Sequence, residues 1–165
     1  MVGLIGIQLA GQSSRKVSLL VDFHSNHTLY DRIIKNANGG GISLGMTINT
    51  NWRFKPLFEL DYDFFLTTYV LVFENGKELV KKNRVPSFFI GSIYSIKDRF
   101  FIKGVVGPSI IKSDVYFSIK PSVGFIIDKK QRFSTQLSLV NVFERDAAGN
   151  EPFGYVNLAF IIRVF

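Results

Sequence analysis

Residues Val115–Asp128 read Val-Tyr-Phe-Ser-Ile-Lys-Pro-Ser-Val-Gly-Phe-Ile-Ile-Asp and carry the strongest structural signal in the chain. Every odd position is apolar, whereas most even positions are polar or small. Side chains that alternate in this way point to opposite faces of a β-strand. The alternating segment is longer than an average soluble strand, which has about 5–6 residues. It is long enough for a tilted strand to cross a bilayer, which takes about 9–11 residues. The stretch therefore predicts a membrane-spanning strand.

The same alternation recurs along the chain. Residues 42–48 alternate Ile, Leu and Met with Ser, Gly and Thr, and residues 54–64 alternate Phe, Leu and Tyr with Lys, Glu and Asp. Residues 156–164, near the carboxyl terminus, show the same alternation. The pattern predicts these strands: Val17–His24, Gly41–Thr50, Arg53–Phe73, Lys77–Ile96, Arg99–Ile111, Asp114–Asp128, Arg132–Glu144 and Phe153–Phe165.

Composition restricts the class of protein. The chain has 165 residues, of which 47% are hydrophobic and 17 are Phe, yet no apolar run approaches the about 20 residues of a transmembrane helix. In hydrocarbon every backbone polar group must be paired, and for strands a closed barrel achieves this. We therefore expect an all-β fold, an eight-stranded antiparallel up-and-down transmembrane β-barrel in a bacterial outer membrane.

Charge and cysteine content exclude other functions. The net charge of +7 comes from Lys and Arg scattered through turns and loops, with no basic face interleaved with aromatic residues, so nucleic acid is not an expected partner. With no cysteine, the chain has neither disulfides nor thiolate metal sites. No second cluster of His or carboxylates completes an oxygen shell, so we expect no metal and no cofactor.

The amino-terminal segment differs from the rest. Residues 1–12 form a mostly apolar stretch with small residues toward its end, and Val2–Gly11 shows little clean alternation. We interpret residues 1–16 as a truncated signal or a periplasmic lead-in, and residues 17–165 as the barrel domain. An extra strand over Val2–Gln8 is the alternative. It would need a further partner strand to keep the count even, giving ten strands instead of eight.

Three predicted turns carry an Arg-Phe pair, at residues 53–54, 99–100 and 132–133. Each Phe falls on the lipid-facing parity of the strand that follows. An aromatic ring at the boundary with an Arg beside it is typical of the girdle of a membrane barrel. We expect these interface aromatics: Phe54, Phe100, Phe133 and the terminal Phe165. The connections on the other side are generally longer, as in outer-membrane barrels, where such loops face outward.

Several short patterns resemble a known family. They are Gly41-Ile-Ser-Leu-Gly, Lys55-Pro-Leu-Phe-Glu-Leu, Ile102-Lys-Gly-Val-Val-Gly-Pro and Lys120-Pro-Ser-Val-Gly-Phe, together with the aromatic terminus. From about Val17 onward the chain resembles small outer-membrane β-barrels of the PorT-like type found in Bacteroidota, with a plan shared with OmpA-like and OmpX-like barrels. The resemblance implies outer-membrane lipids and the barrel assembly machinery as partners. The chain departs from the family at Arg163, where the assembly signal usually has Tyr.

Strand parity predicts which polar groups face the lumen. An eight-stranded barrel is just wide enough for its interior to be filled by side chains, and unpaired buried charges are costly. We therefore expect a plugged lumen with a paired polar network, which makes the protein structural or active through loops that bind an unidentified partner. Ion or small-solute binding by the carboxylates is the alternative. The predicted network comprises Asp22, Lys55, Glu59, Asp61, Asp63, Lys103, Lys120 and Arg163, with His24 and Gln136 on the same parity.

The sequence leaves two alternative functions to consider. A soluble lipocalin-like barrel would require the opposite parity, with apolar residues inside around a ligand. A lipid A-modifying hydrolase is suggested by His24 and Ser25, but in a strand these two side chains point to opposite faces and cannot form a nucleophile and its base. We therefore expect no enzymatic activity and no catalytic residue.

Overall fold

The computed structural model describes residues 16–30, 37–50, 52–69, 79–96, 99–111, 114–143 and 153–165. These residues contain no helix, and so none that could cross a membrane. The described chain forms eight strands. They are β1 (Val17–Tyr30), β2 (Asn38–Ile48), β3 (Phe54–Tyr69), β4 (Leu79–Ser95), β5 (Phe100–Ile111), β6 (Asp114–Ile126), β7 (Phe133–Phe143) and β8 (Phe153–Arg163).

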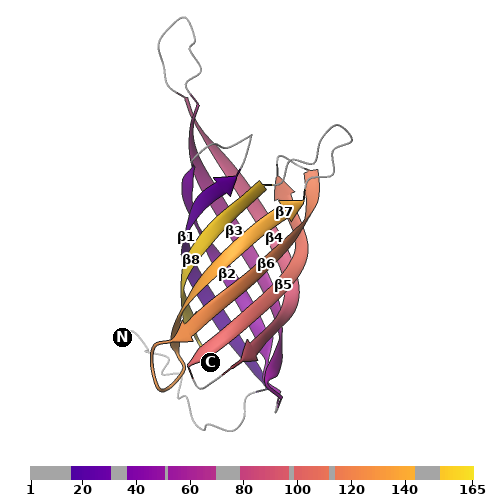
Figure 1. Cartoon of the computed structure of the whole chain (residues 1–165), viewed down its shortest axis with the longest axis vertical. Helices are drawn as coiled ribbons and strands as arrows, with labels where there is room; N and C mark the ends of the chain where they lie inside the picture. Colours follow the sequence, from indigo (N-terminus) through magenta and orange to yellow (C-terminus); the bar gives the residue numbers. More distant parts are fainter. Residues whose placement is uncertain are drawn as a thin grey trace, which may run out of the picture.

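The strands close into a barrel in sequence order (Figure 1). Each strand pairs antiparallel with its neighbour, and β8 returns to β1 with Phe160 opposite Phe23 and Ile162 opposite Val21. Closure leaves no unpaired sheet edge, which is the condition for strands in hydrocarbon. The predicted fold, an eight-stranded antiparallel up-and-down barrel, is confirmed.

The two faces of the sheet have opposite chemistry. Large apolar side chains cover the outside, as along β2, where Ile42, Leu44 and Met46 are exposed. On the opposite parity of the same strand, Ser43 and Thr47 are buried inside. The lipocalin-like hypothesis required the reverse arrangement and is wrong for the described residues. Such an outer surface is unfavourable in water and suits lipid.

Strand ends differ from the prediction chiefly in β1, which continues to Tyr30 instead of ending at His24. Residues 25–28 are Ser, Asn, His and Thr, so both faces are polar and the period-two hydrophobic signal disappears. Strand pairing nevertheless continues on both sides: Ser25 lies opposite Gly40 of β2 and opposite Leu158 of β8. The other seven strands begin and end within a few residues of their predicted bounds.

Strand β1 begins and strand β8 ends at the lower end of the barrel in Figure 1, where the short β2–β3, β4–β5 and β6–β7 connections also lie. We call this the turn end and the opposite one the loop end. At the turn end the rings of Phe54, Phe100 and Phe133 are 56%, 53% and 36% exposed, and that of Phe165 is 44% exposed. Of the predicted lead-in over residues 1–16, all but Lys16 lies outside the described residues.

Candidate functional site

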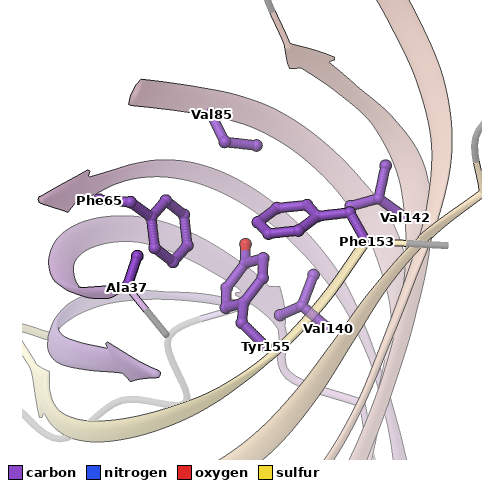
Figure 2. Close-up of a cluster of buried hydrophobic side chains, with 7 residues drawn as sticks. All are labelled: Ala37, Phe65, Val85, Val140, Val142, Phe153 and Tyr155. Carbon is purple, nitrogen blue, oxygen red and sulfur yellow. The ribbon is translucent and has the colours of Figure 1, made fainter. Parts of the chain in front are cut away.

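Near the loop end a group of buried apolar side chains packs together inside the barrel, and we call this group the aromatic plug (Figure 2). The Phe65 ring meets the Tyr155 ring edge-on at 5.0 Å and the Phe153 ring at 5.6 Å. Both Phe65 and Tyr155 have no exposed surface. Edge-to-face packing of this kind stabilises aromatic pairs beyond the area they bury. The remaining members are Ala37, Val85, Val140 and Val142.

A hydrogen-bonded cluster centred on Asp63 lies next to the plug. The Tyr155 hydroxyl donates to Asp63 Oδ2 over 2.7 Å, and the amide of Asn26 donates to Asp63 Oδ1. His24 lies between two carboxylates, with Nε2 at 2.7 Å from Asp63 Oδ1 and Nδ1 at 2.7 Å from Asp22 Oδ1. Both ring nitrogens are therefore occupied, and Tyr155 joins the plug to the polar lumen.

A second cluster contains two ammonium and two carboxylate groups. Lys103 Nζ donates to Glu59 Oε2 over 2.7 Å, and Lys120 Nζ donates to Glu59 Oε1 over 2.9 Å and to Asp61 Oδ2. Lys120 has no exposed surface, and its Nζ lies 5.9 Å from the centre of the Phe89 ring. Charges held in this way satisfy one another, and a buried charge is tolerated on that condition.

Smaller polar groups fill part of the remaining interior. The Ser118 hydroxyl donates to Ser109 Oγ over 2.7 Å, and the Ser109 and Ser87 hydroxyls are 2.6 Å apart. Gln136 donates to Ser138 Oγ over 2.8 Å. The serines were not among the predicted lumen residues, although their inward parity in β4, β5 and β6 was a usable signal. Tyr155 and Asn26 were likewise not predicted as partners of Asp63.

At the turn end the lumen opens into a cavity of about 320 Å³, which we call the turn-end cavity. Its rim includes the exposed residues Arg53 and Gln131, and its wall includes Lys55 and Arg163. Beside it, Asp128 stabilises the β6–β7 turn by accepting the backbone N–H groups of Phe133 and Arg132 at 2.8 and 2.7 Å. The N–H of Phe133 is the main reason that the pKa of Asp128 is lowered.

The structure thus places the predicted lumen residues in two locations. Six lie in the buried clusters just described: Asp22, Glu59, Asp61, Asp63, Lys103 and Lys120. Lys55 and Arg163 are not part of those clusters and lie half-buried at the turn-end cavity.

The geometry offers no catalytic dyad at His24 and Ser25. His24 points into the lumen and Ser25 is exposed on the outer face. In the part of the chain that the structure describes, no group of three or more His, Cys, Asp or Glu residues is arranged to hold a metal ion.

No protein-family model and no curated protein matches the chain. Solved structures do. Ail of Yersinia pestis, crystallised with the heparin analogue sucrose octasulfate, is 10% identical with a TM-score of 0.60, covering 89% of this chain and 96% of that one. Ail in a phospholipid bilayer nanodisc is 11% identical with a TM-score of 0.56, covering 88% and 99%. Neisserial surface protein A is 7% identical with a TM-score of 0.50, covering 90% and 97%.

At these identities the likeness concerns the fold. The chain has the eight-stranded barrel of bacterial outer-membrane proteins, and its exterior carries the apolar surface that lipid requires. The protein therefore has the fold and the lipid-facing exterior of an integral outer-membrane β-barrel.

Proposed function

We propose that the protein is a non-enzymatic, non-conducting outer-membrane barrel that acts as a membrane scaffold for its loops. The aromatic plug is the observation that carries this proposal, because seven apolar side chains from several strands meet across the loop end of the lumen. Below it the ion-paired clusters occupy the interior. We expect a lumen filled in this way to offer no continuous water path.

Planar-bilayer recording tests the proposal. The purified protein should show no steady conductance, whereas the combined Phe65→Ala, Phe153→Ala and Tyr155→Ala variant should show an increased one because it removes the rings of the plug. The matched control is Phe58→Ala, which removes a ring from the lipid-facing side of β3. A stable, porin-like conductance of the unsubstituted monomer would contradict the proposal.

Binding by the loops is the second part of the proposal. The connecting sequences and adjacent strand ends on the loop side are rich in basic residues: Arg32, Lys35, Lys77, Lys81, Lys82 and Arg84. Such residues attract anionic headgroups, and Ail, which shares the fold, was crystallised with an anionic heparin analogue. We therefore propose an anionic partner, with phosphorylated lipid headgroups as the first candidate.

Vesicle flotation tests this part. Detergent-solubilised protein should bind vesicles containing anionic lipid more strongly than neutral vesicles, and replacing Lys77, Lys81 and Lys82 by Gln should reduce the difference. Replacing Lys129, Lys130 and Arg132 by Gln at the turn end is the control. Equal loss of binding in both triple variants would mean that net charge, and not the loops, is responsible.

We also propose that the protein is a PorT-like barrel. The sequence patterns of β2, β3, β5 and β6 support a PorT-like barrel, and we propose that the assembly machinery recognises the segment formed by β8 and the residues up to Phe165. Residues 1–16 are proposed to precede the barrel as a signal-like or periplasmic segment. Deletion of Phe165 should slow assembly into membranes containing the machinery, measured by the folded band on unheated gels.

A further inference from the structure

We propose that the turn-end cavity binds a small organic anion that carries hydroxyl groups. In outer-membrane barrels the short turns lie on the periplasmic side, so this site would take its ligand from the periplasm. The inference rests on the charges, the unpartnered polar atoms and the shape of the cavity, and it does not depend on what the loops bind.

Within the part of the chain that the structure describes, the cavity carries cationic groups that have no carboxylate partner. Lys55 and Arg163 line it, and Arg53 lies at its rim. Among the described residues, no carboxylate lies within ion-pair distance of these three side chains. Asp128 attracts Arg163 electrostatically, but the two side chains do not form an ion pair. Lys55 and Arg163 also repel one another. An anion placed between them would relieve that repulsion.

The acidic groups of the wall do not cancel this charge. Glu59 lines the cavity but accepts from Lys103 and Lys120, and Asp22 is held by His24. Their negative charge is therefore balanced by Lys103, Lys120 and His24. Among the described residues, the Arg163 guanidinium donates to Gln131 Oε1 over 3.5 Å, which is at the limit of a hydrogen bond.

Unpartnered polar atoms gather on the same wall. In the described residues, Ser43 Oγ, Thr47 Oγ1, Gln136 Oε1 and Arg163 Nε are buried side-chain atoms without a hydrogen-bond partner, and all four residues line the cavity. Ser43, Thr47 and Gln136 are 2%, 1% and 1% exposed. Buried polar atoms are satisfied in most native proteins, so this concentration points to a polar ligand. The hydroxyls and the amide oxygen suit the hydroxyl groups of such a ligand.

Part of the wall is apolar. Phe101 and Ile161 line the cavity together with Leu20 and Ile93. A volume of about 320 Å³ is at the lower end of the range for small-molecule sites, about 300–1,000 Å³. A sugar phosphate or sugar acid has the required combination of an anionic head, hydroxyl groups and a carbon–hydrogen face.

Isothermal titration calorimetry on the full chain in detergent micelles tests the inference. The probes are glucose 6-phosphate and gluconate, with neutral glucose and inorganic phosphate as partial ligands. We expect saturable binding of at least one of the first two, and at least tenfold weaker binding of glucose. Arg163→Gln and Lys55→Gln should each weaken binding about tenfold, the usual effect of losing one charged hydrogen bond. Ser43→Ala should weaken it less.

The matched control is Arg99→Gln, which removes an exposed cation near the same end but outside the cavity. It should leave binding unchanged, and a folded band on unheated gels should be present for every variant compared. The inference is overturned if no probe binds saturably, or if both cavity variants bind as the parent does. Inorganic phosphate binding as tightly as glucose 6-phosphate would overturn the requirement for hydroxyl groups.

Discussion

Lys120 is the residue on which the charge balance of the lumen depends most. Its ammonium contacts both Glu59 and Asp61 and is fully buried. Lys120→Met should therefore lower the free energy of unfolding by about 3–5 kcal/mol, the cost of leaving buried charge unpaired. Urea titration in lipid vesicles measures this change.

The controls separate charge from packing. Lys129→Met removes an exposed cation in the β6–β7 turn and should change stability by less than about 0.5 kcal/mol. Combining Lys120→Met with Asp61→Asn should recover part of the loss, because one of the stranded carboxylates is neutralised. If the double variant is as unstable as the sum of the two single ones, the ion pair is not what stabilises this part of the lumen.

The sequence predicted which residues point inward but not which of them touch. Parity within a strand follows from a period of two, so Asp63 and His24 could each be assigned to the lumen. Their contact joins β1 to β3 across β2, and it depends on the register of both pairings. Register and barrel tilt arise from closure of the whole sheet, and no local pattern encodes them. The separation of Lys55 and Arg163 from the buried clusters was unpredictable for the same reason.

At the scale of the element, eight strands were predictable because lipid imposes a long, regular alternation. The prediction failed where β1 extends past His24, because Asn26 and Thr28 inside and Ser25 and His27 outside are all polar. Near the loop end pairing no longer requires an apolar outer face. The hydrophobic period therefore marks the lipid-embedded part of a strand and not its hydrogen-bonded length.

Two glycines on adjacent strands give an element-scale prediction. A Cβ added at Gly91 of β4 would lie 2.0 Å from the carbonyl oxygen of Gly104 and 2.7 Å from Val105 Cα, both backbone atoms of β5. A Cβ at Gly104 would meet nothing within 4 Å. Gly91→Ala should therefore destabilise the barrel by about 1–3 kcal/mol, as overpacking does. Gly104→Ala should be nearly neutral. Equal effects in urea titration would contradict the close approach of β4 and β5.

At the scale of the whole molecule, closure between β1 and β8 can be tested by crosslinking. Phe23 and Phe160 are direct partners, and directly opposed residues lie within the Cα separation that a disulfide spans. Since the chain has no cysteine, the pair Phe23→Cys and Phe160→Cys has no competing thiol. It should form an intramolecular disulfide in the folded protein. Phe23→Cys with Val156→Cys should not, because Val156 pairs with His27. The reverse result would mean a different closing register.

The assignment of the barrel to a membrane depends on its apolar side chains facing lipid, and a nitroxide scan of β2 in lipid vesicles tests this orientation. Single cysteines at Ile42, Ser43, Leu44, Met46 and Thr47 are labelled, and collision with dissolved oxygen, which concentrates in the bilayer, is measured. We predict high oxygen accessibility at the labels on Ile42, Leu44 and Met46 and low accessibility at those on Ser43 and Thr47, matching their outward and inward positions. An inverted alternation, or equal accessibility at all five positions, would contradict a transmembrane barrel with an apolar exterior and a polar lumen.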